Sequence, residues 1–320
     1  MTRELATADL QACTAILARG SRSFRAASRL LPARLRGLAA SLYAFCRVAD
    51  DAVDIGPRND QAVGTLLRRL DDIYAGQPQD DAVDRAFAVA VRACRIPRAI
   101  PAALIEGFAW DAAGRRYADL PALKEYCARV ASTVGVMMAL LFDVRSPDVM
   151  ARAADLGLAM QLTNIARDVG EDARQGRIYL PLDWLAQAGI DPDQFIARPV
   201  FTPELGQVVA RLLETADTYY RLADAGISHL PRSARMSIRT ARLVYADIGR
   251  VITKNGFDSV SRRAFTSGGR KLVLLTRATP SLLWRPRPCG QPPAAATRAL
   301  VEAACGGPRP LGFQTPETHR

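Results

Sequence analysis

The run QLTNIARDVGEDARQGRIYLP, residues 161–181, separates polar and apolar side chains onto two sides of one predicted helix. At about 100° per residue, its polar stripe falls within roughly 80° of arc. The stripe consists of Gln161, Asn164, Asp168 and Asp172. Another side consists of Leu158, Leu162, Ile165 and Val169 and is suited to face a core. The chain must therefore fold into a helical assembly that accommodates two amides and two carboxylates in a row.

Two carboxylates four residues apart on one helix face need a compensating charge if that face is enclosed. Asp168 and Asp172 would repel each other even on an exposed helix. The position four residues after Asp168, where a Lys or Arg could pair with it, is itself acidic. Mg²⁺ takes oxygen ligands and bridges carboxylates to substrate phosphates. Taken alone, the pattern is more typical of a solvated charged face, but a second copy favours a metal site.

The same design occurs earlier, in the run YAFCRVADDAVD. There Arg47, Asp50 and Asp54 fall within roughly 60° on a helix, whereas Asp51 lies about 100° from Asp50. Each acidic helix has an Arg beside its carboxylates, the other being Arg167. Two such faces opposed across a cavity would hold a cluster of Mg²⁺ ions, which would in turn hold a diphosphate. The chemistry indicated is ionisation, in which metals stabilise a leaving diphosphate as its charge develops.

The runs ADDAVD and NIARDVGEDARQGRIYLP resemble the two aspartate motifs of the squalene/phytoene synthase family, and the similarity extends over residues 21–271. Within that family the sequence looks most like the bacterial phytoene synthases. The resemblance implies an all-α fold, a single-domain class I terpenoid synthase built as a helical bundle around a central cavity. It also implies an enzyme that joins two prenyl diphosphates head to head.

The resemblance also implies which residues form the site. Metal binding is expected of Asp50, Asp54, Asn164, Asp168 and Asp172. Substrate contacts are expected of Ser21, Ser23, Phe24, Arg47, Gln161, Asn164, Arg167 and Arg263. Tyr126 and Tyr245 are expected to join the four aspartates as catalytic residues. Plainer roles stay open at this stage: the serines as helix N-caps, Tyr126 as a core residue, and Arg263 with Arg262 as solvated charge.

Apolar periodicity predicts helices along most of the chain. The expected ranges are 7–20, 33–54, 59–75, 80–95, 101–116, 121–142, 148–175, 182–189, 203–229 and 232–254, with a surface loop over 190–203. Gly170 is expected to bend or loosen its helix, since Gly costs about 1 kcal/mol in a helix interior. Glu106 and Asp111, five residues apart, do not share a helix face and are interpreted as structural.

Small residues crowd one face of the helix predicted over 121–142. They are Ala128, Ala131, Ser132, Thr133 and Gly135. Such side chains permit close helix packing, and they also leave room for a prenyl chain. The family usually has VAGTVG where this chain has VASTVG, so Ser132 is expected to narrow or rearrange the pocket locally.

Composition excludes several classes of site. Because the only histidines are His229 and His319, zinc sites, Ser-His-Asp triads and histidine acid–base pairs are nearly excluded. Six cysteines without a C-x-x-C pair are typical of reduced thiols in a cytosolic protein. The N-terminus has no basic-then-apolar leader pattern, and the longest apolar run, 134–142, is too short to span a bilayer. A cytoplasmic protein with no nucleic-acid partner is expected.

The end of the chain differs in composition from the rest. Residues 261–320 contain ten Lys or Arg and two Glu, which is +8 of the chain's +11. Eight of the twenty Pro lie in 279–320, without a sustained apolar period. We therefore expect a helical synthase domain over 1–278 and a basic, disordered tail over 279–320 that contacts anionic membranes.

The function implied by the resemblance is condensation of two geranylgeranyl diphosphates, through prephytoene diphosphate, to phytoene in carotenoid biosynthesis. Mg²⁺ or Mn²⁺ is the expected cofactor, and no NADPH is expected. Three alternatives remain open. Squalene, presqualene diphosphate and dehydrosqualene synthases share the motifs but act on farnesyl diphosphate. A chain-elongating prenyltransferase would show D-D-x-x-D motifs, and this chain has one, Asp50 to Asp54. A non-catalytic assembly factor would be free to lose the aspartates, and all four are present.

Overall fold

The structure, a computed structural model, describes residues 5–20, 22–54, 60–286 and 288–306, and every regular element within these ranges is helical. The elements in chain order are α1 Thr7–Gly20, α2 Arg22–Ser28, α3 Ala33–Asp54, α4 Asp60–Ala75, α5 Ala82–Cys94, α6 Ala99–Ala112, α7 Leu120–Cys127, the π-helical turn η1 Ala128–Ser132, α8 Thr133–Leu141, α9 Pro147–Arg174, α10 Leu182–Gln187, α11 Pro192–Ala197, α12 Pro203–Ile227, α13 Arg232–Lys254, α14 Gly268–Ala278, the 3₁₀ turns η2 Thr279–Leu283 and η3 Ala295–Thr297, and α15 Arg298–Cys305. The all-α prediction is confirmed.

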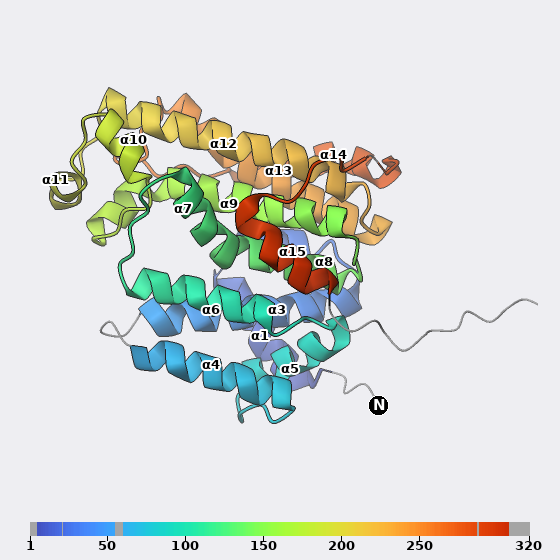
Figure 1. Ribbon diagram of the computed structural model, residues 1–320. Coiled ribbons are helices and arrows are strands. Elements are labelled where there is room, and N and C mark those ends of the chain that lie inside the picture. Colours follow the sequence, from blue (N-terminus) through green and yellow to red (C-terminus); the bar gives the residue numbers. More distant parts are fainter. Residues whose placement is uncertain (1–4, 21, 55–59, 287, 307–320) are drawn as a thin grey trace, which may run out of the picture.

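Helix α9 runs through the middle of the bundle. It has 28 residues, which corresponds to a length of about 42 Å. In Figure 1, α12 and α13 lie above it, and α3, α6, α1, α4 and α5 form the lower part of the molecule. Helix α9 packs along α12 and also contacts α13, η1 and α8. One apolar core gathers around α3, α5, α6 and α8, and a second around α9, α12 and α13.

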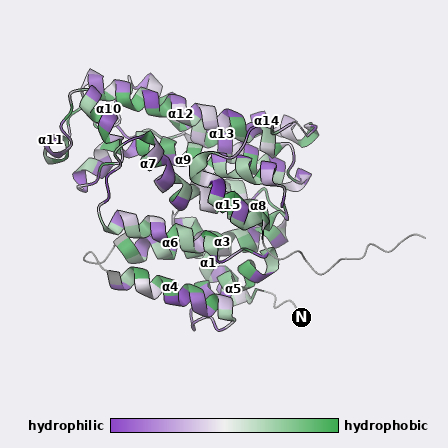
Figure 2. Cartoon of the chain, viewed as in Figure 1, coloured by the Kyte–Doolittle hydropathy of each residue, from purple (hydrophilic) through white to green (hydrophobic). Residues whose placement is uncertain are grey.

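The long helices are amphipathic, as their periodicity predicts. Figure 2 shows hydrophobic and hydrophilic residues mixed along each of them. In α3, for example, Leu38, Leu42, Phe45 and Ala49 recur at helical spacing and are all buried. Helices α1, α3, α9, α12 and α13 begin and end within two residues of their predicted bounds.

The predicted loop over 190–203 contains a short helix that the sequence analysis did not anticipate. This helix is α11, and the Asp191 carboxylate caps it by accepting a hydrogen bond of 2.8 Å from the backbone N–H of Gln194. Pro192 begins the helix, where the missing N–H costs nothing. The loop prediction was therefore wrong over these six residues, because Pro192 begins a helix here and does not interrupt one.

Two glycines allow α9 and the 121–142 segment to approach closely. A Cβ on Gly157 would lie 2.5 Å from Ser132 Cα, and a Cβ on Gly135 would lie 2.4 Å from the Ala153 carbonyl oxygen. The Ser132 hydroxyl is fully buried and donates a hydrogen bond of 2.7 Å to the Ala154 carbonyl oxygen. Ser132 therefore ties the π-helical turn to α9 and does not point into the cavity described below.

Gly170 lets a neighbouring loop approach α9 closely, and it does not bend the helix. Helix α9 continues through it without interruption. A Cβ at this position would lie 2.6 Å from Val260 Cα, and the Gly170 N–H donates a hydrogen bond of 3.1 Å to the Ser259 carbonyl oxygen. The expected bend is therefore replaced by a contact with the loop that follows α13.

The described parts of the predicted disordered tail, residues 279–286 and 288–306, are ordered and pack on the bundle. Helix α15 packs against α6, α8 and α9, and its Leu300, Val301 and Ala304 are buried. Buried Arg152 on α9 donates hydrogen bonds to the carbonyl oxygens of Cys289, at 3.0 Å, and Pro292, at 3.4 Å. The short amphipathic helix α15 could not be predicted from the proline-rich sequence, because the helices that bury it, α6, α8 and α9, are distant in the chain. Residues 307–320 lie outside the described part of the chain.

No helix among the described residues combines the length and the apolar character needed to cross a bilayer. The six cysteines are all free thiols.

Candidate active site

An apolar cavity of about 290 Å³ lies in the centre of the bundle, between α3, α8, α9, α12 and α13. Four residues predicted as substrate contacts or catalytic residues line it, namely Phe24, Gln161, Asn164 and Tyr245. Phe24 stacks on the ring of Tyr43, with 5.2 Å between ring centroids. Most of the wall is aliphatic, which excludes water from whatever the cavity holds.

One stripe of α9 lines the cavity along its length. The stripe consists of Val149, Arg152, Ala153, Leu156, Gly157, Met160, Gln161 and Asn164. These positions recur at three- and four-residue intervals, so a single helix face forms the wall. The wall is mostly apolar near Val149, where Arg152 also lines it, and becomes polar at Gln161 and Asn164, one turn before Asp168.

The small residues of the 121–142 segment were expected either to permit close helix packing or to leave cavity space, and they do both. Ala131 and Gly135 line the cavity. Ser132 and Thr133 are buried and direct their hydroxyls to backbone carbonyl oxygens. Small side chains therefore serve both helix packing and cavity volume, on adjacent sides of the same segment.

Asn164 has a buried oxygen without a partner among the described residues. Its amide NH₂ donates a hydrogen bond of 3.3 Å to the Gln161 side-chain oxygen, but its own Oδ1 accepts none. A buried amide oxygen left unsatisfied costs about 1–3 kcal/mol. Such an orphan at the polar end of a cavity indicates that a ligand supplies the missing partner.

Asp168 is the centre of a charged cluster at the mouth of this polar end. The Arg167 Nε donates to Asp168 Oδ1 at 2.8 Å, and the Arg263 Nε donates to the same oxygen at 2.9 Å. Arg263 also lies 3.1 Å from a carboxylate oxygen of Glu171. Asp168 is mostly buried, whereas Arg263 is 59% exposed, so Arg263 closes the cluster from the solvent side.

The loop that carries Arg263 is positioned by Gly170. The Asp258 carboxylate accepts hydrogen bonds from the backbone N–H groups of Val260 and Ser261, at 3.0 and 2.9 Å, which folds the loop into a tight turn. The loop then rests on α9 where Gly170 has no side chain. The resemblance pointed to Arg263, and the structure brings it onto Asp168.

The first acidic motif, on α3, is held by Arg47. The Arg47 guanidinium donates to Asp50, at 3.2 Å, and to Asp51, at 3.1 Å, so Asp51 belongs to the same ion-pair group. Ser21 lies outside the described residues, and the side chains of Ser23 and Asp54 are not described. Their predicted roles therefore stay predictions.

A cluster that the sequence analysis missed lies around Asp111. The hydroxyls of Tyr126 and Tyr179 each donate a hydrogen bond of 2.8 Å to one oxygen of this carboxylate. The two tyrosine rings stack with centroids 5.2 Å apart, and Tyr117 packs beside them. Tyr126 therefore lies in this polar cluster and not in the cavity wall. No periodic signal marks Asp111, and Tyr179 appeared only as part of the motif run.

Electrostatics connect the two acidic motifs through Asp111. Burial raises the pKa of Asp111 to about 6, and the charge of Asp50 adds to the rise, while hydrogen bonds from Tyr179 and Tyr126 oppose it. Burial, and then the charges of Asp168 and Glu171, raise the pKa of Asp172 to about 8, with Arg177 opposing and Asp111 adding. Carboxylates on α3, α6 and α9 therefore lie close enough to raise one another's pKa values.

Tyr245 lies between this acidic neighbourhood and the apolar cavity. Burial raises the pKa of its phenol, and the charges of Arg167 and Asp168 act on it in opposite directions. Tyr245 also lines the cavity, so one side chain borders both the apolar cavity and the charges of Arg167 and Asp168.

The site is suited to a hard cation that brings ligands of its own. Among the residues that the structure describes, no three carboxylate, His or Cys side chains lie close enough to form a ready-made metal site. Mg²⁺ keeps several waters and is typically held by one or two carboxylates plus substrate phosphates. The orphan oxygen of Asn164 and the raised pKa of Asp172 both fit such a cation.

Comparison with known proteins assigns the chain to a defined family. A family model described as squalene/phytoene synthase matches residues 17–270. The chain is 53% identical over 281 residues to the phytoene synthase of Cereibacter sphaeroides, covering 85% of this chain and 79% of that protein. It is 51% identical over 280 residues to the phytoene synthase of Rhodobacter capsulatus, covering 87% of this chain and 83% of that protein.

Solved structures share the fold. A dehydrosqualene synthase in complex with ligand superposes with a TM-score of 0.79 at 30% identity, covering 86% of this chain and 97% of that one. A squalene synthase from Alicyclobacillus acidocaldarius superposes with a TM-score of 0.70 at 24% identity, covering 78% of this chain and 95% of that one, and at this identity supports the fold alone.

Proposed function

The chain belongs to the squalene/phytoene synthase family, and from that premise we propose that it is a phytoene synthase acting on two molecules of geranylgeranyl diphosphate. The observation that carries the proposal is the continuity of the site. The polar end of the apolar cavity, at Asn164, lies one helical turn from Asp168, where Arg167 and Arg263 converge. A prenyl diphosphate has the same division, with an apolar chain on a head that carries several negative charges.

The length of the cavity wall formed by α9 is compatible with a C20 chain. Between Val149 and Asn164, α9 advances about 22 Å. An extended backbone advances about 1.2 Å per bond, so the sixteen-carbon main chain of a geranylgeranyl group spans about 18 Å. The farnesyl main chain, with twelve carbons, spans about 13 Å on the same scale. The wall formed by α9 is thus long enough for the longer substrate.

A divalent cation, Mg²⁺ or Mn²⁺, supplies the charge that neutralises a departing diphosphate. We propose that Asp50, Asp54, Asn164, Asp168 and Asp172 hold it. Arg47, Arg167 and Arg263 would hold phosphate oxygens by charge-assisted hydrogen bonds, exchanging their present carboxylate partners for the substrate. The substrate head would then replace the ion pairs that Asp168 makes with Arg167 and Arg263.

The reaction that these residues serve has two ionisations. The first C–O bond to diphosphate breaks, and the allylic cation alkylates the double bond of the second substrate. Loss of a proton closes a cyclopropane, which gives prephytoene diphosphate. The second diphosphate then leaves, the skeleton rearranges, and loss of another proton gives phytoene. The aliphatic wall protects each cation from water, and the released diphosphate or a site tyrosine are the candidate bases.

Phytoene is an uncharged hydrocarbon, so we further propose that the protein works in contact with an anionic membrane.

The alternative function is that of a squalene-type enzyme, which quenches the last cation with hydride from NADPH or acts on farnesyl diphosphate. The 30% identical dehydrosqualene synthase structure is the observation that keeps this alternative in view.

The test is turnover with defined substrates. Purified protein should convert geranylgeranyl diphosphate and Mg²⁺, without NADPH, into a C40 hydrocarbon with the near-ultraviolet absorption of a conjugated triene. Farnesyl diphosphate should be the poorer substrate. Accumulation of the cyclopropyl diphosphate alone, relieved by adding NADPH, would assign the protein to the squalene-type enzymes instead.

A further inference from the structure

Exposed apolar side chains concentrate in one short segment near the mouth of the site. Among the described residues, five large hydrophobic side chains are exposed, and four of them lie between residues 265 and 283. They are Phe265 at 74%, Leu272 at 64%, Val273 at 45% and Leu283 at 83%. We call this set, on α14 and its flanks, the α14 face. Single exposed hydrophobics are ordinary, but four in one segment mark a contact surface.

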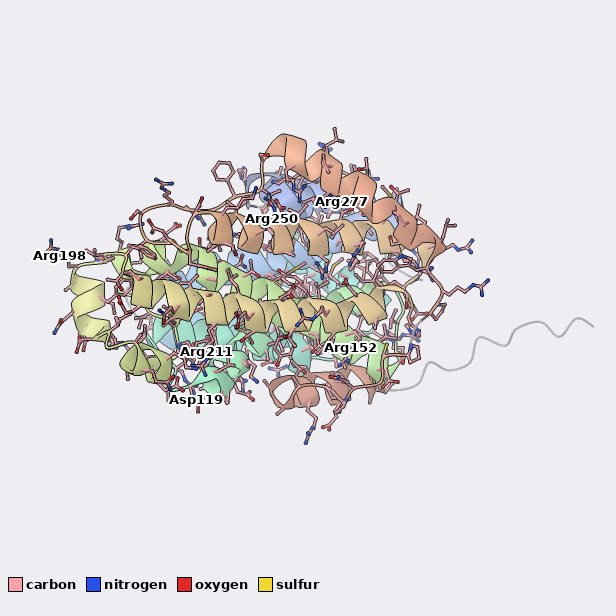
Figure 3. All side chains as sticks on the ribbon, turned by 90° about the horizontal axis from the view of Figure 1, so that it is seen from above. Asp119, Arg152, Arg198, Arg211, Arg250 and Arg277 are labelled. Carbon is pink, nitrogen blue, oxygen red and sulfur yellow. The ribbon has the colours of Figure 1, made fainter. Side chains whose placement is uncertain are left out.

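Helix α14 is oriented so that this face points outward. Its Leu274 and Ala278 are buried, and the helix packs against α13. Leu272 and Val273 lie on the opposite side, and Thr276, one turn further along, is also exposed. Figure 3 shows α14 at the edge of the molecule, with Arg277 beside it. The apolar stripe therefore has no cover within the described chain.

The charge around the α14 face is of one sign. Residues 261–286 contain six Lys or Arg and no Asp or Glu. Two of the six are neutralised, since Arg263 pairs with Asp168 and Arg270 with Asp247, both at 2.9 Å. The other four make no ion pair with a described residue. They are Arg262, Lys271, Arg277 and Arg285. Exposed apolar side chains and unpaired basic residues are thus concentrated in one segment of the chain, residues 262–285.

We propose that the α14 face is the surface by which the protein lies on an anionic bilayer, with α14 parallel to the membrane plane. An outward apolar side flanked by basic residues is the arrangement of an interfacial helix, whose apolar residues enter the headgroup boundary while its cations meet anionic lipids. A second copy of the chain fits less well. A two-fold contact would bring the four unpaired cations of one face against those of the other.

The position of the α14 face gives this contact a consequence for the proposed function, on which this part of the inference rests. Phe265 follows Arg263 by two residues, and Arg263 closes the mouth of the site on Asp168. The mouth therefore opens beside the membrane surface. A hydrocarbon product leaving there would enter lipid without crossing bulk water.

The test measures vesicle binding of the full chain and needs no substrate. The variant Leu272→Ser with Arg277→Glu and Arg285→Glu removes one apolar contact and reverses two charges of the face. The matched control, Val200→Ser with Arg198→Glu, makes the same kinds of change at the other exposed hydrophobic. Figure 3 shows Arg198 and Arg277 toward opposite ends of the molecule. Thermal melting by circular dichroism checks that both variants fold.

Vesicles of equal parts phosphatidylglycerol and phosphatidylcholine should bind the native chain and the control alike. Binding of the α14 variant should be at least about 30-fold weaker, from the loss of two basic side chains alone. Pure phosphatidylcholine should bind all three poorly. Equal binding by the α14 variant and the control would overturn the proposal. So would a native chain that fails to bind vesicles and forms a dimer that the α14 variant cannot form. Turnover in detergent is measured separately, so the proposed function can fail while vesicle binding holds.

Discussion

Replacing Gly170 with Ala should separate the loop that carries Arg263 from α9. The new Cβ would lie 2.6 Å from Val260 Cα and from its carbonyl oxygen, both backbone atoms that cannot rotate away. Overpacking of this kind costs about 1–3 kcal/mol. The same substitution recovers about 1 kcal/mol of helix propensity. The net change in the free energy of unfolding should therefore lie between about zero and a loss of 2 kcal/mol.

Gly64 provides the matched control for that prediction. It also lies inside a helix, α4, but a Cβ there would meet only the far end of the Arg68 side chain, at 3.5 Å. Gly64→Ala should therefore stabilise the protein by about 1 kcal/mol. Urea unfolding should separate the two variants by about 1–3 kcal/mol. Equal stabilisation of both would show that the contact between the loop and α9 is not needed.

The same pair of variants tests the site. If the loop moves, Arg263 leaves Asp168 and Glu171, and the KM for geranylgeranyl diphosphate should rise in Gly170→Ala. Gly64→Ala should leave this KM unchanged, because α4 contributes no side chain to the cavity. A KM that does not change in Gly170→Ala, despite a measured loss of stability, would refute the role given to Arg263.

Three further predictions concern other parts of the molecule. Asp168→Asn should keep its helical circular dichroism and lose more than nine-tenths of its turnover, a barrier increase above about 1.4 kcal/mol; retention of more than a tenth would contradict its assignment to the metal site. Truncation after Ala278 should lower the free energy of unfolding by about 3 kcal/mol or more, because buried Leu300 and Val301 are lost. Glu302→Ala, on the exposed side of α15, should leave the free energy of unfolding unchanged in the same urea titration. Burial raises the pKa of Asp155 from 3.8 to about 7, against the opposing charge of Arg152, so the protonated form of Asp155 is favoured in the folded state. The free energy of unfolding should therefore fall as pH rises from about 4 to 7, and it should fall less in Asp155→Asn than in the native protein. Parallel curves of unfolding free energy against pH would contradict this.

Local pattern in the sequence was enough to predict the helices and the two acidic faces. The apolar spacing of α3 and α9 repeats within a single turn, so neighbouring residues already specify which side is buried. The same spacing places Asp168 and Asp172 one turn apart on α9. The family resemblance added Arg263 and Tyr245, whose positions no local pattern indicates. Segments with short or interrupted patterns, such as α11 and α15, were read as loop or disorder.

Only the tertiary structure decided which of these groups meet. Asp111 looked structural, yet Tyr126 and Tyr179, distant in the chain, both bond to its carboxylate. Gly170 looked like a weak point in a helix, yet it is the space into which the loop bearing Arg263 fits. A contact between residues far apart in sequence depends on how whole helices pack. The chain's own periodicity does not contain that information, because it specifies the buried side of a helix and not the neighbour that covers it.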